Sequence, residues 1–548
     1  MIVGILGSSL YLCGMFVQRK RNESGSYSVI IKEKNPRTRG NRVVMIVGTS
    51  RNERELLELE RKAYEYIDSL RGPLLPMDYH DPLEDGIELF LSGISNSHIQ
   101  VIGPELIYGR LYDKIGYGEL ANDMFRHLVI CRLFNPGSKL RTVEYLRRYL
   151  NVDYDVEAIY KFLDNLCYRK DKDCKKDGHG KPIRPEGDDI KTKVERISFA
   201  YTKRISGDSI SVVFYDMTTL YFEAAQEDDL RKTGFSKDGK HACPQIFLGL
   251  LVAPGGNPIG YEIYEGNIHE GKTLIPVVEV LANKHGFDHP IVVADAGLLS
   301  KSNIEELQKS GYEYIIGARV KNETEEIRQS IIGMNLQYGD IKVIDKGSGV
   351  RLIVSKSEKR AKKDEHARKK GLERLQKRFD TGRLTKANIN RRGYNKYLKM
   401  VGDVTITIDM EKYEADAAWD GVKGFVTNTK LDEKEVLASY SNLWFIERAF
   451  RMNKGDLRAR PIFHRLHNRI EAHICICFTA YTIMLELERL LKAANSDVTI
   501  YQAGHLTKTM YQLNYQMPRS CRLKSMILQM DSKHQELYDI VRQNSDKM

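Results

Sequence analysis

The chain has 548 residues, of which 42% are hydrophobic and 29% are charged. This length and composition predict about three or four globular domains and exclude a disordered chain. The formal net charge of +11 favours a polyanionic partner, nucleic acid above all, over an ordinary enzyme that happens to be basic. The eight cysteines include no C-x-x-C pair, which predicts reduced thiols and no structural zinc.

The apolar run at residues 1–14 is too short to span a bilayer, and no basic residues precede it as they would in a signal peptide. We therefore expect the natural start to be Met15 and residues 1–14 to be an upstream extension. Residues 15–50 contain two runs of alternating pattern, which predict a small β hairpin. A helical pattern follows, and we expect residues 51–200 to form a mostly helical DNA-binding region.

Two amphipathic patterns in this region, 138–150 and 155–166, are joined by a short turn. They resemble a helix-turn-helix, and two helices of a plain bundle remain the alternative. The first pattern carries four cations that a DNA-binding helix would present: Lys139, Arg141, Arg147 and Arg148.

Residues 170–189 are polar, contain Gly and Pro, and are interpreted as a linker. From there to residue 320 the pattern changes to strands and helices in the order β-β-β-α-β-α-β. That order predicts an α/β sheet with an antiparallel hairpin on one side.

Residues 321–432 break this order with several strand-like runs, and we expect a β-rich, basic insertion. Helical patterns return at 433–457 and 469–492, and residues 496–548 are expected to be a C-terminal tail. The charge run inside the insertion is either a solvated helix face or a DNA contact, and its one-signed character favours DNA. The cations predicted to contact DNA are Lys362, Lys363, Arg368, Lys369 and Lys370.

Two acids lie in apolar strand patterns: Asp216 inside VVFYDMTTLYF and Asp295 at the end of IVVAD. An ionised carboxylate among apolar residues is costly unless a cation or hydrogen bonds compensate for it. Two such acids on neighbouring strands can share divalent ions, and oxygen ligands favour magnesium or manganese. We expect a third carboxylate from the helix predicted at 433–457.

Five residues of that helix fall at offsets 0, 4, 7, 11 and 14, which places them on one continuous stripe if the helix is unbroken. A simple core stripe would not carry an acid beside two cations. The alternative is a solvent-exposed ion pair between Glu447 and Arg451. The stripe consists of Tyr440, Trp444, Glu447, Arg451 and Lys454.

The segments around Asp216, Asp295 and Glu447 resemble the three acids of a DDE transposase with an RNase H-like core. The resemblance is to the insertion-sequence-four superfamily of bacterial elements, with its signature Y-x2-R-x3-E-x6-K, and it covers residues 205–490. Leu443 stands at the Arg position of the signature, so Arg448 or Arg451 would have to replace that cation. Further matching pieces are GNIHEGKT, RPIFH and RIEAHICICF.

The resemblance implies an α/β fold in which the RNase H-like core (205–320 and 433–495) is interrupted by the insertion. It implies two Mg²⁺ ions, replaceable by Mn²⁺, held by the three acids. The implied partner is double-stranded DNA, bound by a dimer or higher oligomer in the cytoplasm of a bacterial or archaeal cell, without a membrane. The residues implied to contact DNA are Tyr440, Trp444, Arg448, Arg451 and Lys454.

The stretch GNIHEGKT (266–273) also fits the phosphate-loop pattern G-x-x-x-x-G-K-[ST], so an ATPase acting on DNA is one alternative. Its intervening residues are not small, and Glu270 would place a negative charge against an anion. The preceding strand also belongs to a PGGNP hairpin, so we expect it to be antiparallel. A DNA-binding repressor with an inactive catalytic core is the other alternative.

Overall fold

The computed structural model describes residues 14–35, 40–70, 82–150, 152–167, 189–223, 226–234, 242–268, 273–285, 290–298, 300–382, 389, 393–401, 405–460, 462–517 and 520–545. Most of the expected upstream extension and of the expected linker at 170–189 lies outside these residues. The chain divides into two compact units, Met1–Ile94 and Ser95–Met548.

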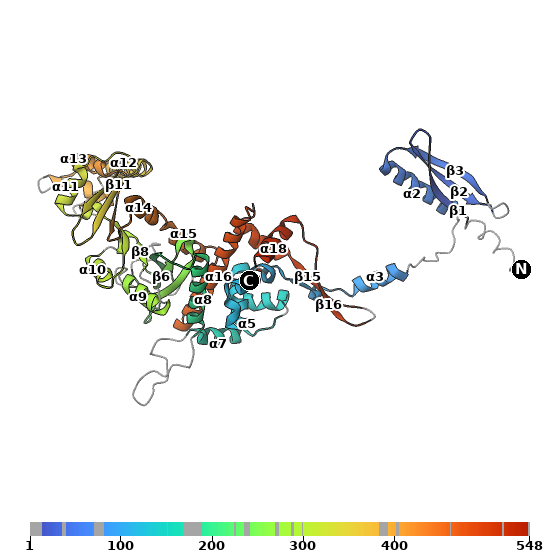
Figure 1. Ribbon diagram of the computed structural model, residues 1–548, viewed down its shortest axis with the longest axis horizontal. Coiled ribbons are helices and arrows are strands. Elements are labelled where there is room, and N and C mark those ends of the chain that lie inside the picture. Colours follow the sequence, from blue (N-terminus) through green and yellow to red (C-terminus); the bar gives the residue numbers. More distant parts are fainter. Residues whose placement is uncertain are drawn as a thin grey trace, which may run out of the picture. The chain divides into compact units, whose positions relative to one another are not determined.

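The first unit is a three-stranded antiparallel sheet with a helix packed on one face (Figure 1). Its elements are β1 (Met15–Arg21), β2 (Tyr27–Lys34), β3 (Asn41–Ser50), α2 (Glu53–Leu70) and α3 (Pro82–Ser92). Val29 and Ile31 of β2 are buried against Leu56, Ala63 and Ile67 of α2. The prediction of a hairpin was therefore incomplete, because β1 ends in the polar, charged run QRKR and its pattern does not indicate a third strand.

An eight-stranded mixed sheet is the centre of the second unit, in the order β10-β11-β14-β9-β8-β5-β6-β7. The neighbours β5, β8 and β9 are parallel, and β6 and β7 form the antiparallel hairpin beside them. The predicted order β-β-β-α-β-α-β is confirmed. The strands are β5 (Val212–Tyr221), β6 (Gln245–Val252), β7 (Pro258–Glu265), β8 (Ile291–Ala294), β9 (Tyr314–Ala318), β10 (Ile341–Asp345), β11 (Arg351–Lys356) and β14 (Val422–Thr427).

Helices cover both faces of this sheet. Side chains alternate along β5 between the two faces of the sheet. Val213, Tyr215 and Met217 belong to one buried cluster, whereas Phe214 and Leu220 belong to the other. The first face is covered by α9 (Leu274–His285) and α10 (Lys301–Lys309). The opposite face is covered by α8 (Ile190–Ile205), α15 (Trp444–Lys454) and α16 (His467–Ala493).

The continuous helix predicted at 433–457 is broken in two. The first part is α14 (Glu433–Ser441), and α15 starts at Trp444. Between them the Leu443 N–H donates to the Tyr440 carbonyl oxygen at 3.1 Å, a tighter turn than an α-helix makes. The Leu443 side chain is buried in the core below the turn, so the position of the signature Arg is here a packing position.

The helix α16 is long and apolar enough to cross a membrane, but 94% of its most apolar stretch is buried inside the fold, as in a core helix. Helices from both ends of the unit pack on it. These are α4 (Arg110–Ile115), α5 (Asp123–Phe134), α7 (Val156–Leu166) and α18 (Ser532–Ser545).

The pair α6 (Lys139–Tyr145) and α7 is the segment that resembled a helix-turn-helix. The packing of α7 on α16 supports the bundle alternative. Lys139 is buried, and burial, with Arg132 beside it, lowers the pKa of its ammonium group to about 7. The expectation that Lys139 is presented to DNA was wrong, because its side chain points into the bundle.

The region expected to be a C-terminal tail is folded. Besides α18 it contains α17 (Ile500–Leu506), β15 (Tyr511–Gln516) and β16 (Leu523–Ile527). The strand β15 pairs with β4 (Ile99–Val101), which joins the two ends of the unit in one small sheet.

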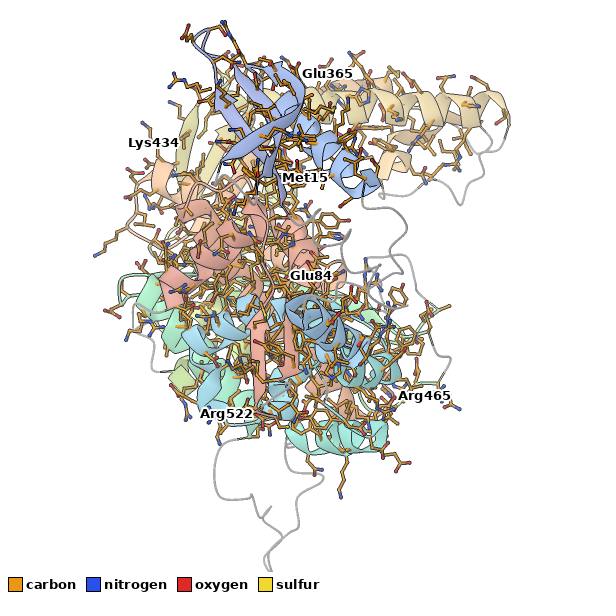
Figure 2. All side chains as sticks on the ribbon, turned by 90° about the vertical axis from the view of Figure 1, so that its right-hand side faces the viewer. Met15, Glu84, Glu365, Lys434, Arg465 and Arg522 are labelled. Atoms are coloured by element: carbon orange, nitrogen blue, oxygen red, sulfur yellow. The ribbon has the colours of Figure 1, made fainter. Side chains whose placement is uncertain are left out.

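In the expected insertion, β10, β11 and β14 extend the central sheet from β9, so these strands are continuous with the core. The first part of the basic run, which extends over residues 358–400, forms a long helix, α12 (Glu358–Asp380), with side chains along its whole length (Figure 2). The remaining elements are α11 (Glu325–Gly333), β12 (Leu398–Val401), β13 (Thr405–Ile408) and α13 (Met410–Ala415).

Candidate active site

Asp216 and Asp295 lie side by side on neighbouring strands. The strands β5 and β8 are parallel, and Tyr215 pairs with Ala294, so the next residue on each strand is an aspartate. A carboxylate oxygen of Asp216 accepts the Met217 N–H at 2.7 Å, and one of Asp295 accepts the Ala296 N–H at 2.7 Å. The side chain of Asp216 is half-buried, whereas that of Asp295 is exposed where β8 ends.

Tyr440 of α14 lies near both acids and donates a hydrogen bond to one of them. Its hydroxyl donates to a carboxylate oxygen of Asp295 at 3.1 Å. Burial raises the pKa of Tyr440, and the charges of Asp295 and Asp216 raise it further, so both acids lie near this hydroxyl. Gly317 of β9 leaves room for the ring: a methyl group added there would lie 2.4 Å from the hydroxyl. The neutral phenol therefore holds Asp295 in a fixed direction.

Glu447 of α15 is exposed on the cleft that contains Asp295 and Tyr440. This cleft has a volume of about 770 Å³ and lies between the central sheet and the elements of the insertion. The helix α15 is fixed on the sheet face of Asp216, because Phe445 packs against Phe214 with ring centroids 6.3 Å apart. The three predicted acids therefore belong to one region of the fold.

The same cleft contains cations that the sequence interpretation missed. Lys423 of β14 lies with its ammonium group 4.2 Å from the centre of the Tyr440 ring. Burial and the nearby Arg360 lower the pKa of Lys423, while Asp295 and Glu447 act in the opposite direction. A signal was present: Lys423 interrupts the apolar strand VKGFVT, as Asp216 interrupts its own strand.

Within the described residues, no three carboxylate, imidazole or thiolate side chains are close enough together to form a ready metal site. The donor set nevertheless suits a hard divalent cation, because Asp216 and Asp295 are adjacent and the cleft offers Glu447 as a third carboxylate. These are the residues that could hold Mg²⁺ or Mn²⁺.

The break between α14 and α15 divides the predicted stripe. Tyr440 is buried on α14, whereas Trp444, Glu447 and Arg451 are exposed on α15 and Lys454 is half-buried. Among the ion pairs of the described residues there is none between Glu447 and Arg451, so the alternative of a simple surface pair is not supported. Both groups are left facing the surface.

Arg448 has a structural partner. Its guanidinium pairs with Glu488 of α16 at 2.6 Å and lies 6.0 Å from the centre of the Trp444 ring. Glu488 also pairs with Lys492, at 2.7 Å. Arg448 therefore fixes α15 on α16, which leaves Arg451 as the more accessible substitute for the signature cation.

The five cations predicted on α12 fall into two groups. Arg368 pairs with Asp420 at 2.6 Å, with both side chains largely buried, and its guanidinium lies 4.8 Å from the centre of the Tyr413 ring. Arg368 therefore holds the helix to α13 and the loop after it. The other four cations, Lys362, Lys363, Lys369 and Lys370, are exposed, and Lys362 and Lys369 each pair with a glutamate one turn earlier.

The phosphate-loop alternative is not supported by the surroundings of GNIHEGKT. The strand β7 before it is the edge strand of the sheet and is antiparallel to β6, as expected. Residues 269–272 lie outside the described part. Thr273 is buried, and its hydroxyl bonds to the sulfur of Met217 at 2.7 Å and accepts from Tyr215 at 3.0 Å. In a phosphate loop this hydroxyl must face Mg²⁺.

Comparison with known families gives a match to the transposase DDE domain over residues 207–483, just over half of the chain. A search of curated proteins finds no match. Among solved structures, a piggyBac transposase synaptic complex with hairpin DNA is similar at 10% identity, over 74% of this chain and 78% of that chain, with a TM-score of 0.37.

Two structures of the Mos1 transposase are also similar. A paired-end complex with the left transposon end has 12% identity over 32% of this chain and 53% of that chain, with a TM-score of 0.15. A mariner paired-end complex with Mn has 13% identity over 46% of this chain and 71% of that chain, with a TM-score of 0.14.

Proposed function

Because the chain belongs to the transposase DDE domain family, we propose that it moves a bacterial insertion sequence of the insertion-sequence-four type. It binds the terminal inverted repeats of its element as double-stranded DNA, cuts the strands at the ends, and joins the freed 3′-hydroxyls to target DNA.

The observation that carries this proposal is the adjacency of Asp216 and Asp295 on parallel neighbouring strands, with Glu447 on the cleft that Asp295 lines. Asp295 and Glu447 come from distant parts of the sequence and have no packing reason to line one cleft, and Asp216 lies beside Asp295. A basic chain with net charge +11 suits a DNA substrate.

In this proposal Asp216, Asp295 and Glu447 would hold two divalent ions, Mg²⁺ or Mn²⁺. Such ions, when bound, make water or a 3′-hydroxyl nucleophilic and stabilise the leaving oxygen. Tyr440 keeps Asp295 oriented through the hydrogen bond of 3.1 Å. Lys423 and Arg360 line the same cleft and can neutralise the phosphates beside the cut bond.

Further DNA contacts are assigned to Trp444, Arg451 and Lys454 of α15 and to the exposed lysines of α12. Cutting both ends of an element in concert requires a dimer or higher oligomer of this chain. The reaction takes place on the nucleoid in the cytoplasm of a bacterial or archaeal cell.

The test is a strand-nicking assay on DNA that carries the element's ends, with Mg²⁺ or Mn²⁺. Asp216→Asn and Asp295→Asn are expected to bind the ends like the wild type and to lose nicking, because an amide keeps the shape without the charge. The matched control is Asp345→Asn, an exposed aspartate at the end of β10 on the far edge of the sheet. Retained nicking in either site variant contradicts the assignment of the two acids. If the wild type binds the ends without nicking them, the protein is instead a DNA-binding repressor with an inactive catalytic core.

A further inference from the structure

The sheet of the first unit has one face that α2 does not cover. Since side chains alternate along a strand, the pairing assigns Phe16, Gln18 and Lys20 of β1 to the same face as Ser28, Ile30, Lys32 and Lys34 of β2. The β2–β3 register adds Asn41, Val43, Ile46 and Thr49 of β3 to it. We call these eleven residues the open face.

Charge is divided between the two sides of this unit. The open face carries three lysines, Lys20, Lys32 and Lys34, and no carboxylate. The helix α2 on the other side carries three cations (Arg54, Arg61 and Lys62) and an excess of acids: Glu53, Glu55, Glu58, Glu60, Glu65 and Asp68.

Arg19 is one of two β1 cations, with Arg21, on the face that α2 covers, and its charge is already neutralised. Arg19 pairs with Glu53 at 2.6 Å and donates to Glu60 at 2.9 Å. The pKa of Glu60 is lowered, first of all by its hydrogen bond from Arg19. On the described residues of the three strands, no carboxylate lies on the same face as the lysines of the open face, so the sheet does not neutralise their positive charge.

The polar side chains of the open face can form hydrogen bonds with a partner, in addition to the charge attraction of the lysines. Gln18 and Thr49 are exposed, and Ser28 bonds to Thr49 at 2.7 Å and to Asn22 at 2.8 Å, which fixes that end of the face. Ile46 is 62% exposed and Val43 is 48% exposed, although both lie in a folded sheet. Apolar side chains that are exposed to water between amides and lysines are unfavourable. They become favourable against a partner surface that offers methyl groups and hydrogen-bond acceptors.

We propose that the open face binds duplex DNA, with the sheet in the major groove. Two neighbouring strands, about 4.8 Å apart, form a ribbon of the size that the major groove, about 12 Å wide, admits, and the third strand then lies at the edge of the groove. Lys20, Lys32 and Lys34 contact phosphates. Gln18 and Thr49 bond to base edges, and Ile46 lies against thymine methyl groups, which are the contacts that these side chains make in the major groove.

This inference rests on the proposed function only in that it supplies the transposase with a domain that recognises its element's ends. Binding and cutting are read out separately below. Failure of one therefore does not hide the result of the other.

The experiment measures the affinity of the full-length chain for a duplex of the element's end over a range of salt concentrations. The test variant is Lys20→Gln/Lys32→Gln/Lys34→Gln. The control is Arg54→Gln/Arg61→Gln/Lys62→Gln, which removes the same charge from the exposed side of α2 in the same unit.

Each phosphate contact adds about 0.9 to the slope of log affinity against log salt concentration. The test variant is therefore expected to lower that slope by about 2.7 and the control to leave it unchanged. Gln18→Ala is expected to reduce the preference for the element's end over random duplex without changing the slope. Equal slopes for test variant and control overturn the proposal.

A second measurement needs no variant. The three lysines of the wild type are acetylated with and without duplex, and their modification is compared with that of Lys62 on α2. Selective protection of Lys20, Lys32 and Lys34 by DNA supports the proposal. Protection that appears without DNA and depends on protein concentration shows that a second copy covers the face, and this also overturns it.

Discussion

The hydrogen bond from Tyr440 to Asp295 gives the most specific prediction about the site. Tyr440→Phe removes one hydroxyl from a ring that Phe425 and Lys423 hold in place. A hydrogen bond to a charged acceptor contributes about 1.5–3 kcal/mol. At about 1.4 kcal/mol per tenfold change, strand nicking should fall roughly 10- to 150-fold. Binding of the DNA ends should not change.

Gly317 allows the same bond to be broken from the other side. In Gly317→Ala the new methyl group would lie 2.4 Å from the Tyr440 hydroxyl and 3.1 Å from the Ala296 nitrogen. Since both variants act on one bond, the loss in the double variant should be smaller than the product of the two single losses.

The assay compares nicking rates of the four proteins, and calorimetric titration with Mn²⁺ reports on Asp295 without DNA. Weaker Mn²⁺ binding by Tyr440→Phe identifies Tyr440 as a positioning residue. Wild-type nicking and Mn²⁺ binding in Tyr440→Phe, or multiplicative losses in the double variant, would refute the reasoning.

Two further predictions concern cations that the structure places in unexpected surroundings. Arg368→Gln should lower the unfolding temperature, because it leaves the largely buried Asp420 without its partner at a cost of about 1–3 kcal/mol. The control, Lys370→Gln, should weaken DNA binding without changing the unfolding temperature. Equal unfolding temperatures of the two variants, measured by calorimetry, would contradict this prediction. Lys139→Met should stabilise the fold, because the buried ammonium has a pKa of about 7, below the 10.5 of an exposed lysine. Between pH 7 and pH 10.5 the unfolded chain binds more protons than the folded one, so the free energy of unfolding rises with pH in this range. The destabilisation by Lys139 is therefore complete below pH 7 and disappears as the pH rises toward 10.5. At pH 8 the gain is on the order of 3 kcal/mol at about 1.4 kcal/mol per pKa unit, and a gain that does not shrink between pH 8 and pH 10 would show that packing alone is responsible.

The sequence predicts the central sheet well because its strands are apolar and bounded by clear turns. Asp216 and Asp295 could be found for the same reason, since an acid in an apolar strand is conspicuous. Their adjacency could not, because it depends on which strands pair. Lys423 carried the same signal in VKGFVT, but its role depends on the pairing of β14 with β9, across more than a hundred residues of sequence.

The helix break at Leu443 illustrates another limit. Spacing alone places Tyr440 and Glu447 on one continuous stripe, because the residues between them include no Gly or Pro that would predict a break. The burial of Leu443 against the core accompanies a tight turn instead. Charge runs have a similar ambiguity: Arg368 and Lys370 look alike in sequence, and only the position of Asp420 distinguishes a structural cation from an exposed one.

The central claim is that Asp216, Asp295 and Glu447 serve one metal-dependent site. The most direct measurement compares Glu447→Gln with Glu435→Gln in cleavage and strand joining on the element's ends, with Mg²⁺ and with Mn²⁺. Glu435 is the matched control, because it lies on the neighbouring helix and its carboxylate is engaged with the Asp432 N–H at the start of α14. Glu447→Gln should abolish both steps while Glu435→Gln retains them; cleavage by Glu447→Gln at the wild-type rate would contradict the account.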